Sequence, residues 1–250
     1  MTPWELALLG VSALFTSALT AMVGFGGGVI LLGVLLLFYP PASAIPLHGA
    51  VQLVSNGWRV VLFKDTIAWR IGLRFMALLP VGVAVGLWFF QGLPAAAIQL
   101  LIGGVVAASL FSRRMARFRG RELPLNAFVP LGFVVGILNM MVGVVGPLLA
   151  VLVVRRDLNR MQMIGTQGFF ALSGHVLKVL AFGLVGFSFR QHLPALAVML
   201  PAVLLGGALG KWLLGRFSEA AFLWGFQVLL TVLALKLILW DGLLGLLRST

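Results

Sequence analysis

The chain has no cysteine, a single tyrosine and only six acidic residues among its 250 residues. Without cysteine it forms no disulfide, binds no metal through a thiolate and uses no thiol nucleophile. Charged residues make up 10% of the chain, whereas a soluble domain carries about a quarter. Apolar residues take their place, at 61% hydrophobic and a mean hydropathy of +1.12. This composition predicts an integral membrane protein with one transmembrane domain over residues 1–250.

The few acids also lie where they exclude several kinds of chemistry. All six lie at the ends of apolar segments or between them: Glu5, Asp65, Glu122, Asp157, Glu219 and Asp241. A cation pathway needs a carboxylate at membrane depth, and a hydrolase needs paired acids or a nucleophile beside a base. The three histidines, His48, His175 and His192, are too scattered for a metal site. We therefore expect a protein that is not an enzyme and has no cofactor and no metal.

The formal net charge of +12 invites a nucleic-acid interpretation. However, the basic residues lie mostly in loops that flank apolar segments, which is the pattern of the positive-inside rule. We expect membrane lipid as a partner and no nucleic acid. The N-terminus has no basic region before its apolar run, so no cleaved signal peptide is predicted.

Two of the apolar segments are too short to cross a bilayer. The ten segments are 4–23, 29–38, 47–63, 71–90, 95–111, 125–142, 148–154, 161–182, 193–214 and 220–240. Segment 29–38 would rise only about 15 Å, roughly half the hydrocarbon thickness. Segments 29–38 and 148–154 each follow a glycine-containing stretch, MVGFGGG at 22–28 and MVGVVGP at 141–147. Broken helices at membrane depth are tolerated only where protein buries them or a cavity needs them.

The two halves of the chain repeat. An ungapped shift of 119 residues aligns 22–63 with 141–182. The matched pairs include Gly24/Gly143, Gly27/Gly146, Ile45/Ile164, Gly49/Gly168 and Phe63/Phe182. We interpret this as a duplication, with repeat one at 1–112, a basic cytoplasmic linker at 113–123 and repeat two at 124–250.

Loop charges predict how the repeats are oriented. Five arginines at 113–121 put the linker in the cytoplasm, and the basic loop 155–160 belongs there too. Each loop of repeat two then lies on the side opposite to its partner in repeat one. We therefore expect an all-α integral membrane protein of two inverted-topology repeats, each with about five segments and a glycine-broken hairpin near the midplane. It would be a multi-pass protein of the inner (plasma) membrane with both termini outside.

One alternative topology stays open. Each broken helix could run straight through as one kinked span, which would make the repeats parallel. That topology would put Arg155, Arg156, Arg160 and Arg216 outside, against the positive-inside rule.

Polar residues collect inside the third segment of each half. His48, Gln52, Asn56 and Arg59 are spaced by about 4, 4 and 3 residues, which puts them on one helix face. Such residues in a membrane helix usually face a partner or a watery cavity. The predicted substrate-binding residues are His48, Gln52, Asn56, Arg59, Thr166, Gln167, His175 and Lys178. In the alternative interpretation, the cations reach the membrane interface and the amides bond neighbouring helices.

The glycine breaks predict an anion site. A half-helix that begins inside the membrane presents free N–H groups and a positive dipole end, where anions bind. The backbone at Gly26, Gly27, Gly28, Gly143 and Gly146 would supply these groups beside Arg59 and Lys178. The site would take a small anionic substrate near the midplane. Alternatively the glycines only allow close helix packing; glycine faces such as Gly82/Gly86 fit internal packing and a homodimer equally well.

These motifs together resemble the TauE/SafE (sulfite exporter) family of membrane proteins. The resemblance rests on Gly24-Phe-Gly-Gly-Gly28, on Pro40-Pro41 with Ala44, on Gly143–Pro147 with Leu148-Leu149-Ala150, and on Ile164-Gly165-Thr166. It covers essentially the whole chain and implies export of small sulfur-containing anions such as sulfite, sulfoacetate or other organosulfonates.

The expected function is thus transport of such an anion by alternating access. Outward movement of one negative charge is favoured by about 2.3 kcal/mol per 100 mV of inside-negative potential, so no coupling ion is required. His48 or His175 could still couple protons. The alternatives are a transporter of another small anion, a metal or cation permease, and a membrane scaffold that transports nothing.

Overall fold

The computed structural model describes residues 1–23, 26–118, 122–143, 146, 149, 155–213, 228 and 231–249. All regular secondary structure in these residues is helical, as the composition predicts. Five helices in this part of the chain are long and apolar enough to cross a membrane. The protein is therefore an α-helical membrane protein.

The helices follow the predicted segments closely. The first half contains α1 (Pro3–Val23), α2 (Gly27–Phe38), α3 (Pro41–Leu62), the short η1 (Lys64–Thr66), α4 (Trp69–Gly92) and α5 (Ala95–Phe118). The second contains η2 (Leu125–Ala127), α6 (Phe128–Val142), α8 (Arg160–Leu184), η3 (Phe189–His192), α9 (Leu193–Leu213), the π-helical η4 (Lys236–Leu243) and α11 (Leu244–Ser249). Most of the predicted segment 148–154 and the first part of 220–240 lie outside the described residues.

Helix α5 is longer than the apolar segment predicted at 95–111. It continues to Phe118, into the basic linker expected at 113–123. The physical reason is local, because the stretch after Gly104 contains neither glycine nor proline up to Phe118 and is rich in good helix formers. Residues 119–121 of the linker lie outside the described part of the chain.

The chain reverses direction at the first glycine break. Gly26 has a φ of +100°, and a Cβ on Gly27 would lie 1.9 Å from the Thr16 carbonyl oxygen, so both positions require glycine. The returning helix α2 has 12 residues and rises about 18 Å, well short of a full span. At its end the Tyr39 hydroxyl donates to Met1 Sδ over 2.7 Å, so α2 ends where α1 begins. These two helices form a hairpin rather than one kinked span.

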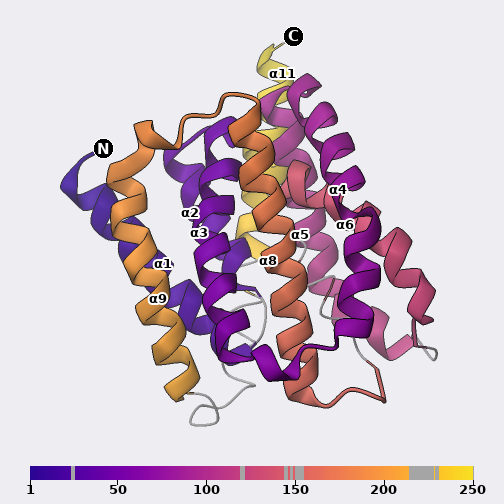
Figure 1. Cartoon of the computed structure of the whole chain (residues 1–250). Coiled ribbons are helices and arrows are strands. Elements are labelled where there is room, and N and C mark those ends of the chain that lie inside the picture. The colour runs from indigo at the N-terminus through magenta and orange to yellow at the C-terminus, as the bar shows by residue number, and fades with distance from the viewer. Residues whose placement is uncertain are drawn as a thin grey trace.

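Helices of the two halves pack against each other in exchanged pairs. Helix α1 lies along α9, and α4 lies along α6 (Figure 1). A Cβ on Gly82 of α4 would lie 2.1 Å from the Phe133 carbonyl oxygen of α6, and one on Gly206 of α9 would lie 2.1 Å from that of Leu14 in α1. Phe133 is the residue that the 119-residue shift aligns with Leu14. The two helix pairs therefore make equivalent close contacts. The Gly82 face of α4 packs against α6 of the same chain.

Helices α3 and α8, which the shift aligns with each other, cross at the centre. Gly49 of α3 lies against Lys178, and Arg59, further along α3, lies against Gly168, which comes earlier in α8. The two helices are therefore antiparallel. Residues that the shift aligns follow one another in opposite directions along the two helices.

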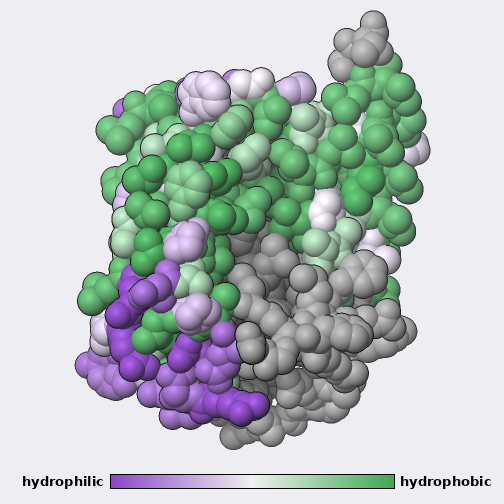
Figure 2. All heavy atoms as spheres, turned by 90° about the vertical axis from the view of Figure 1, so that its right-hand side faces the viewer, coloured by the Kyte–Doolittle hydropathy of each residue, from purple (hydrophilic) through white to green (hydrophobic). Residues whose placement is uncertain are grey.

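The surface is apolar over the upper part of the face in Figure 2, with hydrophilic side chains at its lower end. Large apolar side chains face outward, among them Trp4 (74% exposed), Trp88 (70%) and Leu184 (88%). Exposure on this scale fits lipid rather than water as the neighbour. Both termini lie at the upper end of Figure 1.

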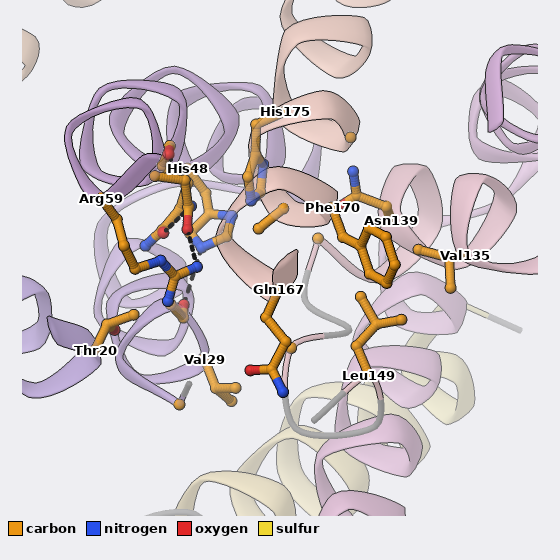
Figure 3. A pocket seen from close by; sticks show the side chains of 18 residues that line it. Thr20, Val29, His48, Arg59, Val135, Asn139, Leu149, Gln167, Phe170 and His175 are labelled. Atoms are coloured by element: carbon orange, nitrogen blue, oxygen red, sulfur yellow. Dashed lines mark hydrogen bonds between the residues drawn. The ribbon is translucent and has the colours of Figure 1, made fainter. Parts of the chain in front are cut away.

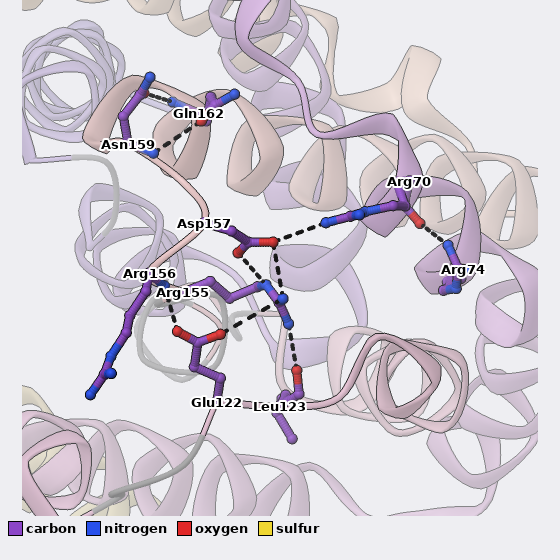
Figure 4. A network of polar contacts seen from close by, with 9 residues as sticks. All are labelled: Arg70, Arg74, Glu122, Leu123, Arg155, Arg156, Asp157, Asn159 and Gln162. Carbon is purple, nitrogen blue, oxygen red and sulfur yellow. Dashed lines mark hydrogen bonds and ion pairs between the residues drawn. The ribbon is translucent and has the colours of Figure 1, made fainter.

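An ionic cluster joins the start of α4 to the segments before η2 and before α8 (Figure 4). Arg155 donates to Asp157 Oδ1 over 2.7 Å and to the Leu123 carbonyl over 2.6 Å, and Arg70 donates to Asp157 Oδ2 over 2.9 Å. Glu122 accepts from the backbone N–H of Arg156. The hydrogen bond from Arg155 lowers the pKa of the Asp157 carboxyl and raises the pKa of the guanidinium. Loops that the charge pattern predicts on one side of the membrane are thus in contact.

The close packing of α4 on α6 predicts a sharp contrast between two glycines. Gly82→Ala should destabilise the protein by about 1–3 kcal/mol, because its Cβ would collide with backbone. Gly104→Ala in α5 is the matched control, since nothing lies within 4 Å of its Cβ position. It should be neutral or stabilising by up to about 1 kcal/mol. Thermal unfolding in detergent measures both; equal melting temperatures would contradict the packing.

The ionic cluster predicts a pH dependence. The folded pKa of Asp157 lies below its ordinary value of 3.8, so its contribution to stability is fully present above that ordinary value and is lost as the pH falls through the lower, folded pKa. Asp157→Asn should lower the melting temperature slightly near neutral pH and make its fall between about pH 5 and pH 3 shallower. Asp65→Asn, an exposed carboxylate outside the cluster, is the control. Parallel pH profiles for Asp157→Asn and the parent would refute the contribution.

Candidate functional site

A cavity of about 60 Å³ lies between the two glycine breaks and the crossing of α3 with α8 (Figure 3). Its walls come from α3 and α8, the beginning of α2, the end of α6 and one residue of α1. The polar lining consists of Thr20, His48, Gln52, Asn56, Arg59, Asn139, Gln167 and His175. Backbone of Gly26, Gly28, Gly143 and Gly146 completes the wall at the breaks. The four predicted polar residues of α3, together with Gln167 and His175 of α8 and glycines of both breaks, therefore meet at one cavity.

Three residues of the stripe on α3, Gln52, Asn56 and Arg59, form a hydrogen-bonded row. Arg59 donates from its guanidinium to Asn56 Oδ1, and Asn56 Nδ2 donates to Gln52 Oε1 over 3.0 Å and to the Gln52 carbonyl over 2.8 Å. All three side chains are buried, with Arg59 only 6% exposed. Burying a cation carries an effective penalty of several kcal/mol. The row therefore holds a guanidinium in a fixed direction at the cavity wall.

Lys178 lies behind the wall and not on it. Its side chain is fully buried, packs on Gly49, and donates from Nζ to the Gly143 carbonyl over 3.3 Å. Gly143 ends α6 with a φ of +76°. Lys178 is thus placed to fix the second break while its charge stays close to the cavity.

Two other predicted residues have packing roles. The hydroxyl of Thr166 accepts from the Ala68 N–H over 2.9 Å, which ties α8 to the segment before α4. Gly27 packs on α1 at Thr16 and Thr20. Thr166, Gly27 and Lys178 are the predicted site residues that lie outside the cavity lining.

Sequence reasoning missed Thr20 and Asn139. They come from α1 and α6, are 8% and 4% exposed, and line the cavity. A signal was present, because the 119-residue shift aligns Thr20 with Asn139, each four residues before the first aligned glycine of its break. Phe170 was missed as well; it stacks on Phe75 with 4.0 Å between ring centroids, which fixes that part of the wall.

The cavity is electropositive. No aspartate or glutamate is among the described residues that line it, and Arg59 lines it directly. At the first break the Gly26 carbonyl accepts a hydrogen bond from the Val29 N–H. The N–H groups of Gly27 and Gly28 come before this first bond, so α2 itself supplies no acceptor for them. Among the residues that the structure describes, no group of three His, Cys, Asp or Glu could hold a metal. The arrangement suits an anion and not a cation.

Comparison with known proteins identifies the family. A family model described as "Sulfite exporter TauE/SafE" matches residues 9–237, which include both glycine breaks and every residue of the cavity lining. The comparisons with curated proteins and with solved structures find no match. The family consists of membrane transporters. The chain belongs to the TauE/SafE family of sulfite exporters.

Proposed function

We propose that the protein exports a small sulfur-containing oxyanion, such as sulfite or a small organosulfonate, and that the cavity between the breaks binds it. One observation carries this proposal. A cavity inside a membrane protein is lined by a buried guanidinium, amide groups and two histidines, with no carboxylate among the described lining residues. Only an anion gains from such a wall.

Arg59 is the main charge partner of the substrate. One guanidinium nitrogen of Arg59 donates to Asn56 Oδ1, which orients the planar group. A guanidinium suits oxyanions because it can donate two parallel hydrogen bonds. The amides of Gln52 and Gln167 come from α3 and α8 and would donate to the remaining oxygens. Lys178 would add a positive field from behind the wall without direct contact.

Size favours the smallest members of the substrate class. A volume of about 60 Å³ corresponds to roughly four water-sized sites. An oxyanion with one sulfur and three oxygens fills such a space, whereas a longer organosulfonate would need the wall to move. Phe170, Val135 and Leu149 form the apolar side against which a short alkyl group would pack.

Alternating access between two inverted repeats is the mechanism that we propose. Antiparallel α3 and α8 and the exchanged pairs α1–α9 and α4–α6 support the inverted arrangement. Because the halves make equivalent contacts, the conformation of one can be adopted by the other, which would carry the site from one side to the other. The ionic cluster would lie on the cytoplasmic side, as the positive-inside rule requires.

The role of Arg59 can be tested by transport. In proteoliposomes, Arg59→Gln should lower the rate of sulfite flux at least about tenfold, since a hydrogen bond to a charged group contributes roughly 1.5–3 kcal/mol. Lys64→Gln removes an equal charge from the exposed η1 and should leave flux unchanged. Unchanged flux in Arg59→Gln would show that the anion binds elsewhere.

Water access to the cavity separates a transporter from a scaffold. In this cysteine-free chain, Ala171→Cys in the cavity lining should react with a small water-soluble thiol reagent, and bound sulfite should slow that reaction. Ala44→Cys, at a fully buried core position, is the control that should stay unreactive. Equal, slow reaction at both positions would favour a scaffold without an aqueous path.

A further inference from the structure

Two histidines face each other at the wall of the cavity (Figure 3). His48 of α3 and His175 of α8 are 1% and 7% exposed, and their rings meet edge to face with 5.7 Å between centroids. His48 Nε2 lies 2.9 Å from the Gly28 carbonyl oxygen at the first break. A carbonyl can only accept, so Nε2 carries the proton and Nδ1 of the neutral ring presents a lone pair.

Each histidine also has a buried ring nitrogen without a partner among the described residues. These nitrogens are Nδ1 of His48 and Nδ1 of His175. Nδ1 of His48 also approaches the second break, 3.7 Å from the Cβ position of Gly143. Buried polar nitrogens are nearly always satisfied in native structures, so an unsatisfied pair in a cavity points to a missing ligand. Protonation of Nδ1 would turn an acceptor into a charged donor.

The charges around the pair decide when protonation is favourable. Arg59 faces it from α3 and Lys178 from α8, while α1, α2 and α6 contribute Thr20, Gly28 and Asn139, which carry no charge. In the empty cavity two cations oppose a further positive charge on a histidine. A bound anion offsets the charge of these two cations and so makes protonation of a histidine less unfavourable. Proton and anion should therefore favour each other in this cavity.

We propose that the His48–His175 pair takes up one proton with each anion that the cavity binds. The proton comes from bulk water and forms one N–H bond at Nδ1, and no other bond changes. One proton is expected per pair because the first charged ring opposes protonation of the second. This inference rests on the proposed function, since it requires an anion in the cavity. A singly charged anion would then cross with its proton and without net charge.

Titration calorimetry on the purified protein tests the coupling directly. Suitable probes are methanesulfonate and sulfate, whose own groups do not titrate near neutral pH, beside sulfite. Tris and imidazole serve as buffers because they differ in ionisation enthalpy and carry neither sulfonate nor phosphate. The binding enthalpy should differ between them by an uptake that approaches about one proton per anion. Affinity should weaken by up to about tenfold per pH unit as the pH rises between about 5 and 8.

Variants assign the proton to the pair. The variants His48→Gln and His175→Asn replace each histidine by the residue type at the aligned position of the other half, Gln167 and Asn56. The double variant should bind the anion with no proton uptake and no pH dependence. His192→Gln removes the third histidine, which lies outside the cavity against Tyr39 and Phe187, and should keep the parent's uptake.

Two results would overturn the proposal and one would overturn its premise. Anion binding by the parent without proton uptake would refute the coupling, and this result needs no variant to fold. Uptake that persists in the double variant would assign the proton to another group, Lys178 first. Absence of binding for all three probes at every pH would instead refute the proposed anion site itself.

Discussion

Buried positive charge is the constraint on which the structure depends. Arg59 and Lys178 are taken out of water inside membrane helices, and no carboxylate lies in the described cavity wall beside them. Desolvation of each ion costs several kcal/mol, which polar groups in the protein must offset. The Asn56 amide does so for Arg59, and the Gly143 carbonyl does so for Lys178. The second glycine break thereby has a role beyond flexibility, because an unbroken helix would have no free carbonyl to offer Lys178.

Close backbone approach makes that arrangement rigid. Gly82 and Gly206 let two helix pairs touch through their carbonyl oxygens, and these pairs flank the crossing of α3 with α8. Without strong hydrophobic driving force inside a membrane, such van der Waals contact and interhelical hydrogen bonds hold helices together. The polar stripes can therefore face a cavity instead of collapsing onto each other.

Local pattern and repetition predicted most of this organisation. The apolar segments, the two breaks and the stripe His48–Gln52–Asn56–Arg59 follow from hydropathy, glycine and helical spacing, and the cavity unites them. The sequence does not reveal that Lys178 donates a hydrogen bond to the Gly143 carbonyl or that the Thr166 hydroxyl accepts one from the Ala68 N–H. Both bonds depend on which helix packs opposite. Thr20 and Asn139 were missed since single polar residues in long apolar helices carry no periodic signal. The helical extension of α5 to Phe118 shows that charge alone does not end a helix.

The aligned positions of the two halves carry different side chains. The shift aligns His48 with Gln167, Gln52 with Ala171, Asn56 with His175 and Arg59 with Lys178. A substrate on the axis between identical halves would meet two equal cations, whereas here one cation lines the cavity and the other braces a break. The proposed site therefore receives its direct positive charge from α3, and the histidines, one from each half, meet across the crossing. A proton shared there would respond to movement of either half, which is what a coupled transporter requires of its coupling site.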